Sequence, residues 1–374
     1  MGRLISDGDG LRSALDWKGA SGLKPCYRHR NVVSKSSDLQ GNGNVDILCA
    51  DFRKFEMWEP GVLEHIVDML AEASSRRASG ALSETRLENL EKSLGFNGNP
   101  LGLLADKTLR EHFGWNQTSF DWVHTALQNG FLTIEAHLYL KACKAHGFHA
   151  KDLAAYLQDN WMWPATFKAK GRNLHYVFAE FRAHASEKAD RLKAMASEML
   201  CLYGLLRHWA ATEVGDLPAL AAQKESFDAA CEVVDIFLQC KRGDIDARLG
   251  ASRGRAAHSR FMVAHRRAYG DDHVVPKHHW AFDIFDQMEE SGILPDAFII
   301  ERLHLRVKAA LEHIKKLTTL EAGTLAGVTE AMFRDASKSA LDALEGTVAD
   351  IEGCRVASLH CRSIPLRSWR RRIL

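Results

Sequence analysis

The stretch Pro276-Lys277-His278-His279-Trp280, followed further along the chain by Ile300-Glu301-Arg302-Leu303-His304-Leu305-Arg306-Val307-Lys308, gives the clearest indication of fold and chemistry. Proline is a favoured first residue of a helix. The second stretch places one carboxylate in an apolar run and then adds cations at helical spacing. Such a helix is more typical of a site for metal and phosphate than of a plain core. The competing interpretation is an amphipathic helix with internal Glu–Lys pairing, which does not explain the Lys-His-His group upstream.

Helical periodicity also dominates the chain before these stretches. Long helical patterns fill residues 174–213, 217–241 and 244–268. Gly292 and Pro295 separate the helix that begins at Pro276 from the helix of Glu301. Shorter helices are predicted from about residue 60 onward, including Phe120 to Leu127 and Ile134 to Ala145. The sequence therefore predicts a mainly α protein.

The N-terminal segment has a different pattern. Residues 2–6 form a short apolar run that ends in Asp7-Gly8-Asp9-Gly10, and residues 45–50 form a second strand candidate. We expect a small α/β element over residues 1–58 and a helical region over 59–275. Further helices are expected over 276–350, and a basic, disordered tail over 351–374.

Composition limits the classes of function. The chain has 374 residues with 46% hydrophobic and 26% charged residues, which is typical of a globular protein. Its net charge of +1 excludes a histone-like basic field, so any nucleic-acid affinity must be local. No apolar run is long enough to span a membrane, and no signal core is present, so we expect an intracellular protein without a membrane partner. The eight cysteines are expected to be reduced.

Two groups near the N-terminus have the residue types of metal ligands. Asp7 and Asp9 follow a strand, and α/β folds often present acids at strand ends, although Asp and Gly also form ordinary turns. Cys26-x-x-His29 has the spacing of half a Zn²⁺ site, but tetrahedral zinc needs two further ligands. Cys49 and distant histidines are the candidates for these. The alternative for this pair is a buried cysteine beside a surface histidine.

A third group is Asp121-x-x-His124. Residues three apart share a helix face, so both side chains could reach one metal ion or one phosphate. An N-cap aspartate followed by a surface histidine explains the same pattern equally well.

Several of these segments together resemble DNA transposases of the CACTA and Kyakuja–Dileera–Zisupton kind. The segments are Ser6-Asp7-Gly8-Asp9-Gly10-Leu11, Trp17-Lys18-Gly19, Pro25-Cys26-Tyr27-Arg28-His29, Lys277-His278-His279 and the helix of Glu301. In those enzymes a strand ends in Asp, a short helix and an aromatic–Lys–Gly turn follow, and a Cys-x-x-Cys comes next. Here His29 stands in place of the second cysteine. The resemblance implies a partial RNase H-like core elaborated by a large helical insertion.

The resemblance also implies a reaction and its residues. Metal-dependent cleavage and strand transfer of DNA would use Mg²⁺ or Mn²⁺ at Asp7, Asp121 and Glu301, with Asp9 as an alternative to Asp7. The expected phosphate contacts are Lys277, His278, His279, Arg302, His304, Arg306 and Lys308. A nuclear location would follow, and homo-oligomerisation is left open. The family's first ligand lies on earlier strands, so we expect a truncated copy with degenerate or lost activity.

Two hypotheses from other classes remain beside the transposase interpretation. One is a non-enzymatic helical scaffold that binds nucleic acid or protein. The other is a zinc-stabilised helical scaffold with no role at DNA. Transposase ancestry predicts that the carboxylates of Asp7 and Glu301 lie within roughly 8 Å of each other in the metal-free protein.

Overall fold

The computed structural model describes residues 4–35, 41, 43–112, 117–159, 177–178 and 189–297. The chain divides into two compact units, Met1–Ala297 and Phe298–Leu374. The fold described below is that of the first unit, since residues 298–374 lie outside the described residues. Helices predominate, so the prediction of a mainly α protein is confirmed.

The helices of the described residues are α1 (Gly8–Ala14), α2 (Pro60–Ala78), α3 (Glu84–Leu94), α4 (Lys107–His112), α5 (Trp122–Ala126), α6 (Phe131–Ala145), α7 (Ala150–Asp159), α9 (Ala196–Trp209), α10 (Ala221–Arg242), α11 (Ala247–Tyr269) and α12 (Pro276–Ser291). The strands are β1 (Leu4–Ser6), β2 (Val32–Val33), β3 (Val45–Asp46) and β4 (Thr118–Phe120). The predicted helices 217–241 and 244–268 agree with α10 and α11 to within a few residues.

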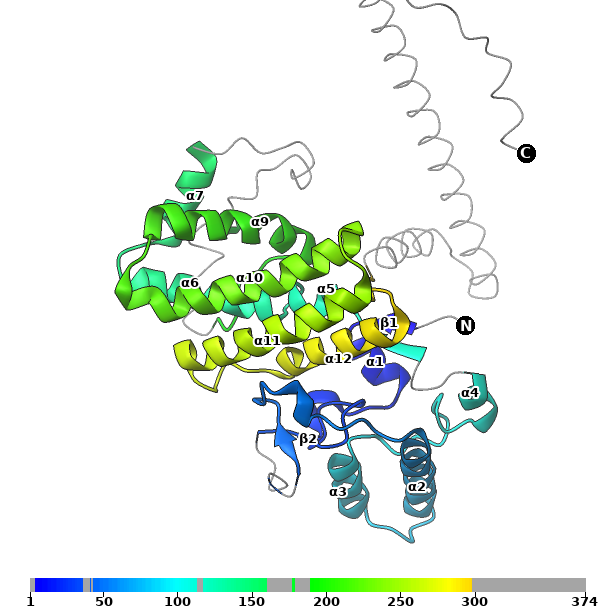
Figure 1. Ribbon diagram of the computed structural model, residues 1–374. Coiled ribbons are helices and arrows are strands. Elements are labelled where there is room, and N and C mark those ends of the chain that lie inside the picture. Colours follow the sequence, from blue (N-terminus) through cyan, green and yellow to red (C-terminus); the bar gives the residue numbers. More distant parts are fainter. Residues whose placement is uncertain are drawn as a thin grey trace, which may run out of the picture. The chain divides into compact units, whose positions relative to one another are not determined.

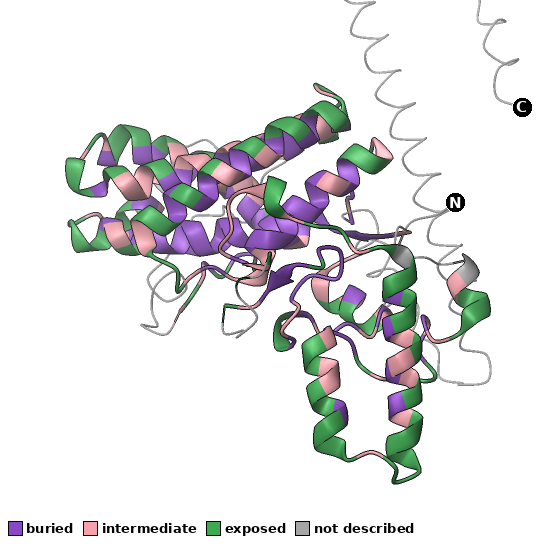
Figure 2. Ribbon diagram, turned by 60° about the horizontal axis from the view of Figure 1, so that its bottom comes forward, coloured by how far each residue is buried: buried purple, intermediate pink, exposed green. Residues whose placement is uncertain are grey.

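The core of the unit lies in a helical body formed by α6, α10, α11 and α12, which lie side by side, with α9 against α10 (Figure 1). Their facing sides are buried (Figure 2). Gly254 lets α11 approach α12 closely, because a Cβ atom there would lie 2.1 Å from the ring of Phe285. The same ring stacks on Phe237 of α10 at 5.0 Å. None of the described helices is long and apolar enough to cross a bilayer.

The α/β part contains two pairs of parallel strands. β1 pairs with β4 in the register Leu4 to Thr118 and Ser6 to Phe120. β2 pairs with β3, and the predicted strand over residues 45–50 is in fact only Val45–Asp46. The sequence did not predict β4, because its three residues show no alternation and its partner strand lies far away in the chain.

A hairpin of α2 and α3 extends from the α/β part (Figure 1). Leu63, Leu70 and Leu87 are buried, but most of its other residues are exposed (Figure 2). Ser83 caps α3 by accepting a hydrogen bond from the backbone of Arg86. The α/β part meets the helical body through α12 and α11, since Phe282 of α12 and Met262 of α11 share a buried cluster with Val32.

Candidate metal centre

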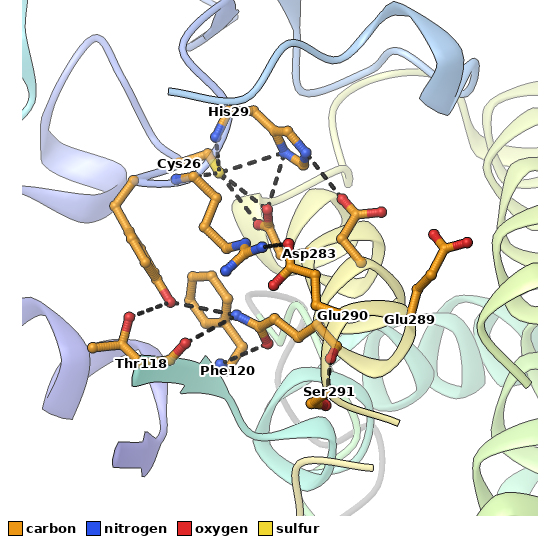
Figure 3. Close-up of polar contacts among 12 residues, drawn as sticks. Cys26, His29, Thr118, Phe120, Asp283, Glu289, Glu290 and Ser291 are labelled. Carbon is orange, nitrogen blue, oxygen red and sulfur yellow. Dashed lines mark hydrogen bonds and ion pairs between the residues drawn. The ribbon is translucent and has the colours of Figure 1, made fainter. Parts of the chain in front are cut away.

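Four buried side chains that are remote in sequence meet between the Cys26 loop (residues 25–31) and α12. They are Cys26, His29, His279 and Asp283, and one ligand atom from each lies within 4.8 Å of all the others. Each side chain belongs to a residue that is no more than 1% exposed. Figure 3 shows Cys26 and His29 directed at Asp283 from the opposite side. This group, called the metal cluster below, could hold a metal ion.

Local structure explains how each half of the metal cluster forms. Pro276 occupies the first turn of α12, and the i, i+4 spacing places His279 and Asp283 on one face of that helix. The Cys26 loop is fixed by a backbone bridge between His29 and Met57. Phe55 packs against the rings of both histidines, at 5.0 Å and 4.7 Å between centroids. Both halves are therefore held by the fold without an ion.

The distances within the metal cluster are short enough for the four side chains to share one ion. Nδ1 of His29 lies 3.0 Å from Nε2 of His279 and 3.0 Å from Oδ1 of Asp283. Sγ of Cys26 lies 3.2 Å from Oδ2 of Asp283 and 3.7 Å from Nδ1 of His29. Two ring nitrogens, a sulfur and a carboxylate oxygen thus surround one point.

The surroundings support ligand roles for Cys26 and His29. The backbone N–H groups of Arg28 and His29 donate to Sγ of Cys26, at 3.3 Å and 3.2 Å, which favours a thiolate. Nε2 of His29 lies 3.1 Å from a carboxylate oxygen of Asp286, which pairs with Arg255. A carboxylate on the second ring nitrogen is the usual orienting contact of a metal-bound histidine.

Burial and neighbouring charges shift the pKa values of the metal cluster in the metal-free protein. Burial raises the pKa of Cys26 to about 11. Burial also lowers the pKa of His279 to about 3, so this ring is neutral. For His29, burial disfavours the cation, but the charge of Asp283 outweighs it and raises the pKa well above its usual value. For Asp283, burial is likewise outweighed by His29, and its pKa is lowered.

The predicted acids Asp7 and Asp121 follow β1 and β4, so they stand at the carboxyl ends of neighbouring parallel strands. The N–H of Asp121 donates to the carbonyl of Ser6 at 3.0 Å, which continues the ladder up to the two acids. Asp9 is largely exposed beside Arg12, 3.8 Å away. The fold thus brings Asp7 and Asp121 together as a pair, called the strand-end acids below.

Both strand-end acids also cap helices. Asp7 accepts a hydrogen bond from the N–H of Gly10 at 2.6 Å and caps α1. Asp121 is fully buried and caps α5 through the N–H of His124 at 2.9 Å. Nδ1 of His124 lies 2.5 Å from the same oxygen, and the N–H of Ala297 donates to the other oxygen at 2.8 Å. The capping alternative for Asp121 is therefore present in the structure.

Lys277 lies close to the strand-end acids. Burial lowers its pKa to about 8, and Arg191 acts in the same direction, while the charges of Asp7, Asp9 and Asp121 oppose the shift. Its Nζ donates to the carbonyls of His124 and Gln128, both at 2.8 Å. This cation therefore joins the start of α12 to the end of α5.

The two histidines expected to contact phosphate lie inside the protein. His278 is fully buried and stacks on Phe261, and burial lowers its pKa well below the usual value. His279 belongs to the metal cluster, so neither ring lies at a surface that a phosphate could reach. Cys49, the other candidate zinc ligand, is half-buried, and its thiol donates to the backbone carbonyl of Asp51. It is therefore not part of the metal cluster.

The remaining predicted site residues belong to the helix of Glu301. Glu301, Arg302, His304, Arg306 and Lys308 lie outside the described residues, as does the tail over 351–374. The expected approach of Asp7 to Glu301 stays a prediction.

The sequence predicted that distant histidines could complete a site with Cys26 and His29, but it did not single out His279, and it missed Asp283. It treated His29 as a surface residue in one interpretation and His279 as a phosphate contact, whereas both are buried. The available signal was the His279-x-x-x-Asp283 spacing on a predicted helix, which is a second half-site.

Comparison with protein-family models, with curated proteins and with solved structures yielded no match.

Proposed function

We propose that this protein is derived from a DNA transposase, that a zinc ion holds its Cys26 loop to α12, and that phosphodiester cleavage is weak or lost in this copy. The observation that carries the proposal is the placement of Asp7 and Asp121 at the ends of the adjacent parallel strands β1 and β4. In this proposal the strand pair is a remnant of an RNase H-like sheet, and the helices between α5 and α12 are the insertion. Metal acids from distant parts of a chain are expected to meet at such strand ends.

Zinc suits the donor set of the metal cluster. Zn²⁺ binds Cys sulfur at about 2.3 Å and His nitrogen or carboxylate oxygen at about 2.0–2.2 Å, which places tetrahedral ligand atoms about 3.3–3.6 Å apart. Four atom pairs of the metal cluster lie 3.0–3.9 Å apart, which brackets this range, and all its ligand atoms lie within 4.8 Å of one another. The charges of one thiolate and one carboxylate would neutralise the ion, which favours its burial.

Zinc binding is expected to release about two protons per ion at pH 7. With a pKa of about 11, Cys26 must lose its thiol proton, and His29 must lose one because its pKa is raised. Calorimetry in two buffers of different ionisation heat measures the number of protons released per zinc ion. Because protons compete with the metal, zinc affinity should rise with pH and fall in acid. Cys26→Ser should lower the release to about one proton, and an unchanged value would exclude Cys26 as a ligand.

The strand-end acids would supply oxygen ligands to Mg²⁺ or Mn²⁺, which activates a water and stabilises the leaving oxygen of a phosphodiester. Lys277 would hold the scissile phosphate only after releasing the carbonyls of His124 and Gln128. Both oxygens of Asp121 already accept hydrogen bonds, so Asp7 is the better placed of the two ligands. This competition is a physical reason for weak activity.

A nicking assay on supercoiled DNA with Mn²⁺ tests the reaction. Wild type is expected to nick slowly, and Asp7→Asn and Glu301→Gln are expected to fall below detection. Asparagine caps helices as well as aspartate does, so the first variant should still fold. Asp216→Asn is the matched control, because Asp216 is exposed and is not one of the predicted metal ligands. Equal activity in all four proteins would exclude cleavage at these acids.

The non-enzymatic scaffold is the second candidate, and a specific observation favours it. Asp7, Asp121 and Lys277 all make hydrogen bonds that stabilise helix ends. If wild type binds zinc but neither nicks DNA nor binds Mn²⁺, these residues have only a structural role.

A further inference from the structure

We propose that α12 couples the metal cluster to the strand-end acids, and that Trp280 is the residue that positions those acids. The inference rests on the proposed function, since it concerns how a metal at one site sets the geometry of the other. On this proposal the zinc ion is required for an ordered pair of strand-end acids.

Sequence adjacency gives the first support. Tyr27 follows Cys26 directly, and Trp280 follows His279 directly. On the acid side, Gly8 follows Asp7 and Phe120 precedes Asp121. Four residues of the two sites are therefore adjacent in sequence to residues that pack between the sites. They are Cys26, His279, Asp7 and Asp121.

These neighbours pack against one another. Trp280 stacks on Phe120 with 5.0 Å between centroids and 14° between planes. Tyr27 lies 5.1 Å from Phe120, and Trp17 contacts both Tyr27 and Trp280. The indole N–H of Trp280 donates to the carbonyl of Pro25 at 2.9 Å. A zinc ion that joins the Cys26 loop to α12 therefore also fixes the rings that support Phe120.

Gly8 leaves no room for a side chain beside α12. A Cβ atom on Gly8 would lie 2.4 Å from Cζ3 and 2.7 Å from Cη2 of Trp280. No side chain larger than hydrogen fits there unless Trp280 moves. The position of Asp7, one residue earlier, is therefore set by the indole ring.

Gln287 ties the far part of α12 to β4. Its Oε1 accepts a hydrogen bond from the N–H of Phe120 at 3.1 Å. On the helix, Trp280 and Gln287 are seven residues apart and face the strands, while His279 and Asp283 occupy the adjacent face. A shift of α12 would therefore disturb both sites at once.

An ordinary apolar core would show the same contacts, so the test must measure coupling. Amide hydrogen exchange is measured at Phe120 and Asp121 with zinc bound and after its removal by a chelator. We expect zinc removal to lower protection at these two amides at least about tenfold while α10 stays protected. Unchanged exchange at Phe120 and Asp121 overturns the coupling.

Gly8→Ala tests the same link with zinc present. Because coupling is reciprocal, pushing Trp280 away from Gly8 should weaken zinc affinity at least about threefold in a chelator competition. Gly204→Ala is the matched control, since a Cβ there meets nothing within 4 Å. The double variant Gly8→Ala/Trp280→Phe should restore affinity, because phenylalanine lacks the outer ring atoms that clash.

The outcomes separate the two proposals. If zinc removal unfolds the whole protein, the Gly8→Ala series decides: unchanged zinc affinity, or no rescue by Trp280→Phe, overturns the coupling. Mn²⁺ binding, followed by electron paramagnetic resonance in wild type and Asp7→Asn, tests the proposed function separately. Coupled exchange without Mn²⁺ binding would keep the positioning role and reject the nuclease chemistry.

Discussion

If the metal cluster holds zinc as proposed, replacing Cys26 by alanine is expected to remove the ion and to lower the melting temperature by roughly 8 °C. A ligand that binds only the folded state contributes about 4 kcal/mol when its free concentration is a thousand times its Kd. The variant loses this contribution because three ligands hold the ion less tightly than four. Elemental analysis gives the zinc content, and calorimetry gives the melting temperature.

Two controls make this result specific to the metal cluster. Cys201→Ala removes a half-buried cysteine outside the metal cluster and should keep one zinc per chain. A chelator should lower the melting temperature of wild type but leave that of Cys26→Ala unchanged. A Cys26→Ala protein with full zinc content would show that the cluster is not the zinc site.

Replacing Glu135 by alanine is expected to destabilise the protein by about 3–5 kcal/mol, because it leaves a cavity and removes the buried partner of an imidazole ring. Oε2 of Glu135 on α6 lies 2.6 Å from Nδ1 of His265 on α11, and both residues are 0% exposed. Nε2 of His265 has no hydrogen-bond partner among the described residues. After the replacement, this buried ring would have no partner at either nitrogen. Urea unfolding measures the change in the free energy of unfolding.

The control for Glu135 is an exposed pair on the same helical body. Glu232→Ala removes the carboxylate that pairs with Arg260, and both side chains are about half exposed, so the cost should be about 0–1 kcal/mol. Glu135→Leu combined with His265→Leu should recover much of the loss, since an apolar pair leaves no buried polar group without a partner. A similar cost for Glu135→Ala and Glu232→Ala would contradict this account.

Local pattern was sufficient for much of the fold. The apolar spacing of residues 217–241 and 244–268 predicted α10 and α11, and the Pro276 and Gly292 signals marked the ends of α12. These features depend on neighbours within a few residues, so the sequence carries them directly. β4 was missed because a three-residue strand owes its existence to its pairing with β1.

For the candidate sites too, the local sequence identified the motifs but not the contacts between them. Cys26-x-x-His29, Asp7 and Asp121 were each recognisable from their own surroundings, and so was the helix that carries His279 and Asp283. Their roles were harder to predict, since burial decides whether a histidine binds a metal or contacts a phosphate. His279 was assigned to phosphate, yet it is 1% exposed and faces His29.

The sequence by itself determined the positions of α10, α11 and α12 and which short motifs hold groups able to bind a metal, because both depend on spacing along the chain. The predicted helix over residues 174–213 was wrong at residues 189–195, which are not helical. Only the tertiary structure decided which half-sites meet. His29 and His279 are 250 residues apart, and Asp7 and Asp121 become neighbours only when β1 pairs with β4. Such long-range contacts arise from the burial of whole helix and strand faces, and no local pattern specifies the partner of a given face.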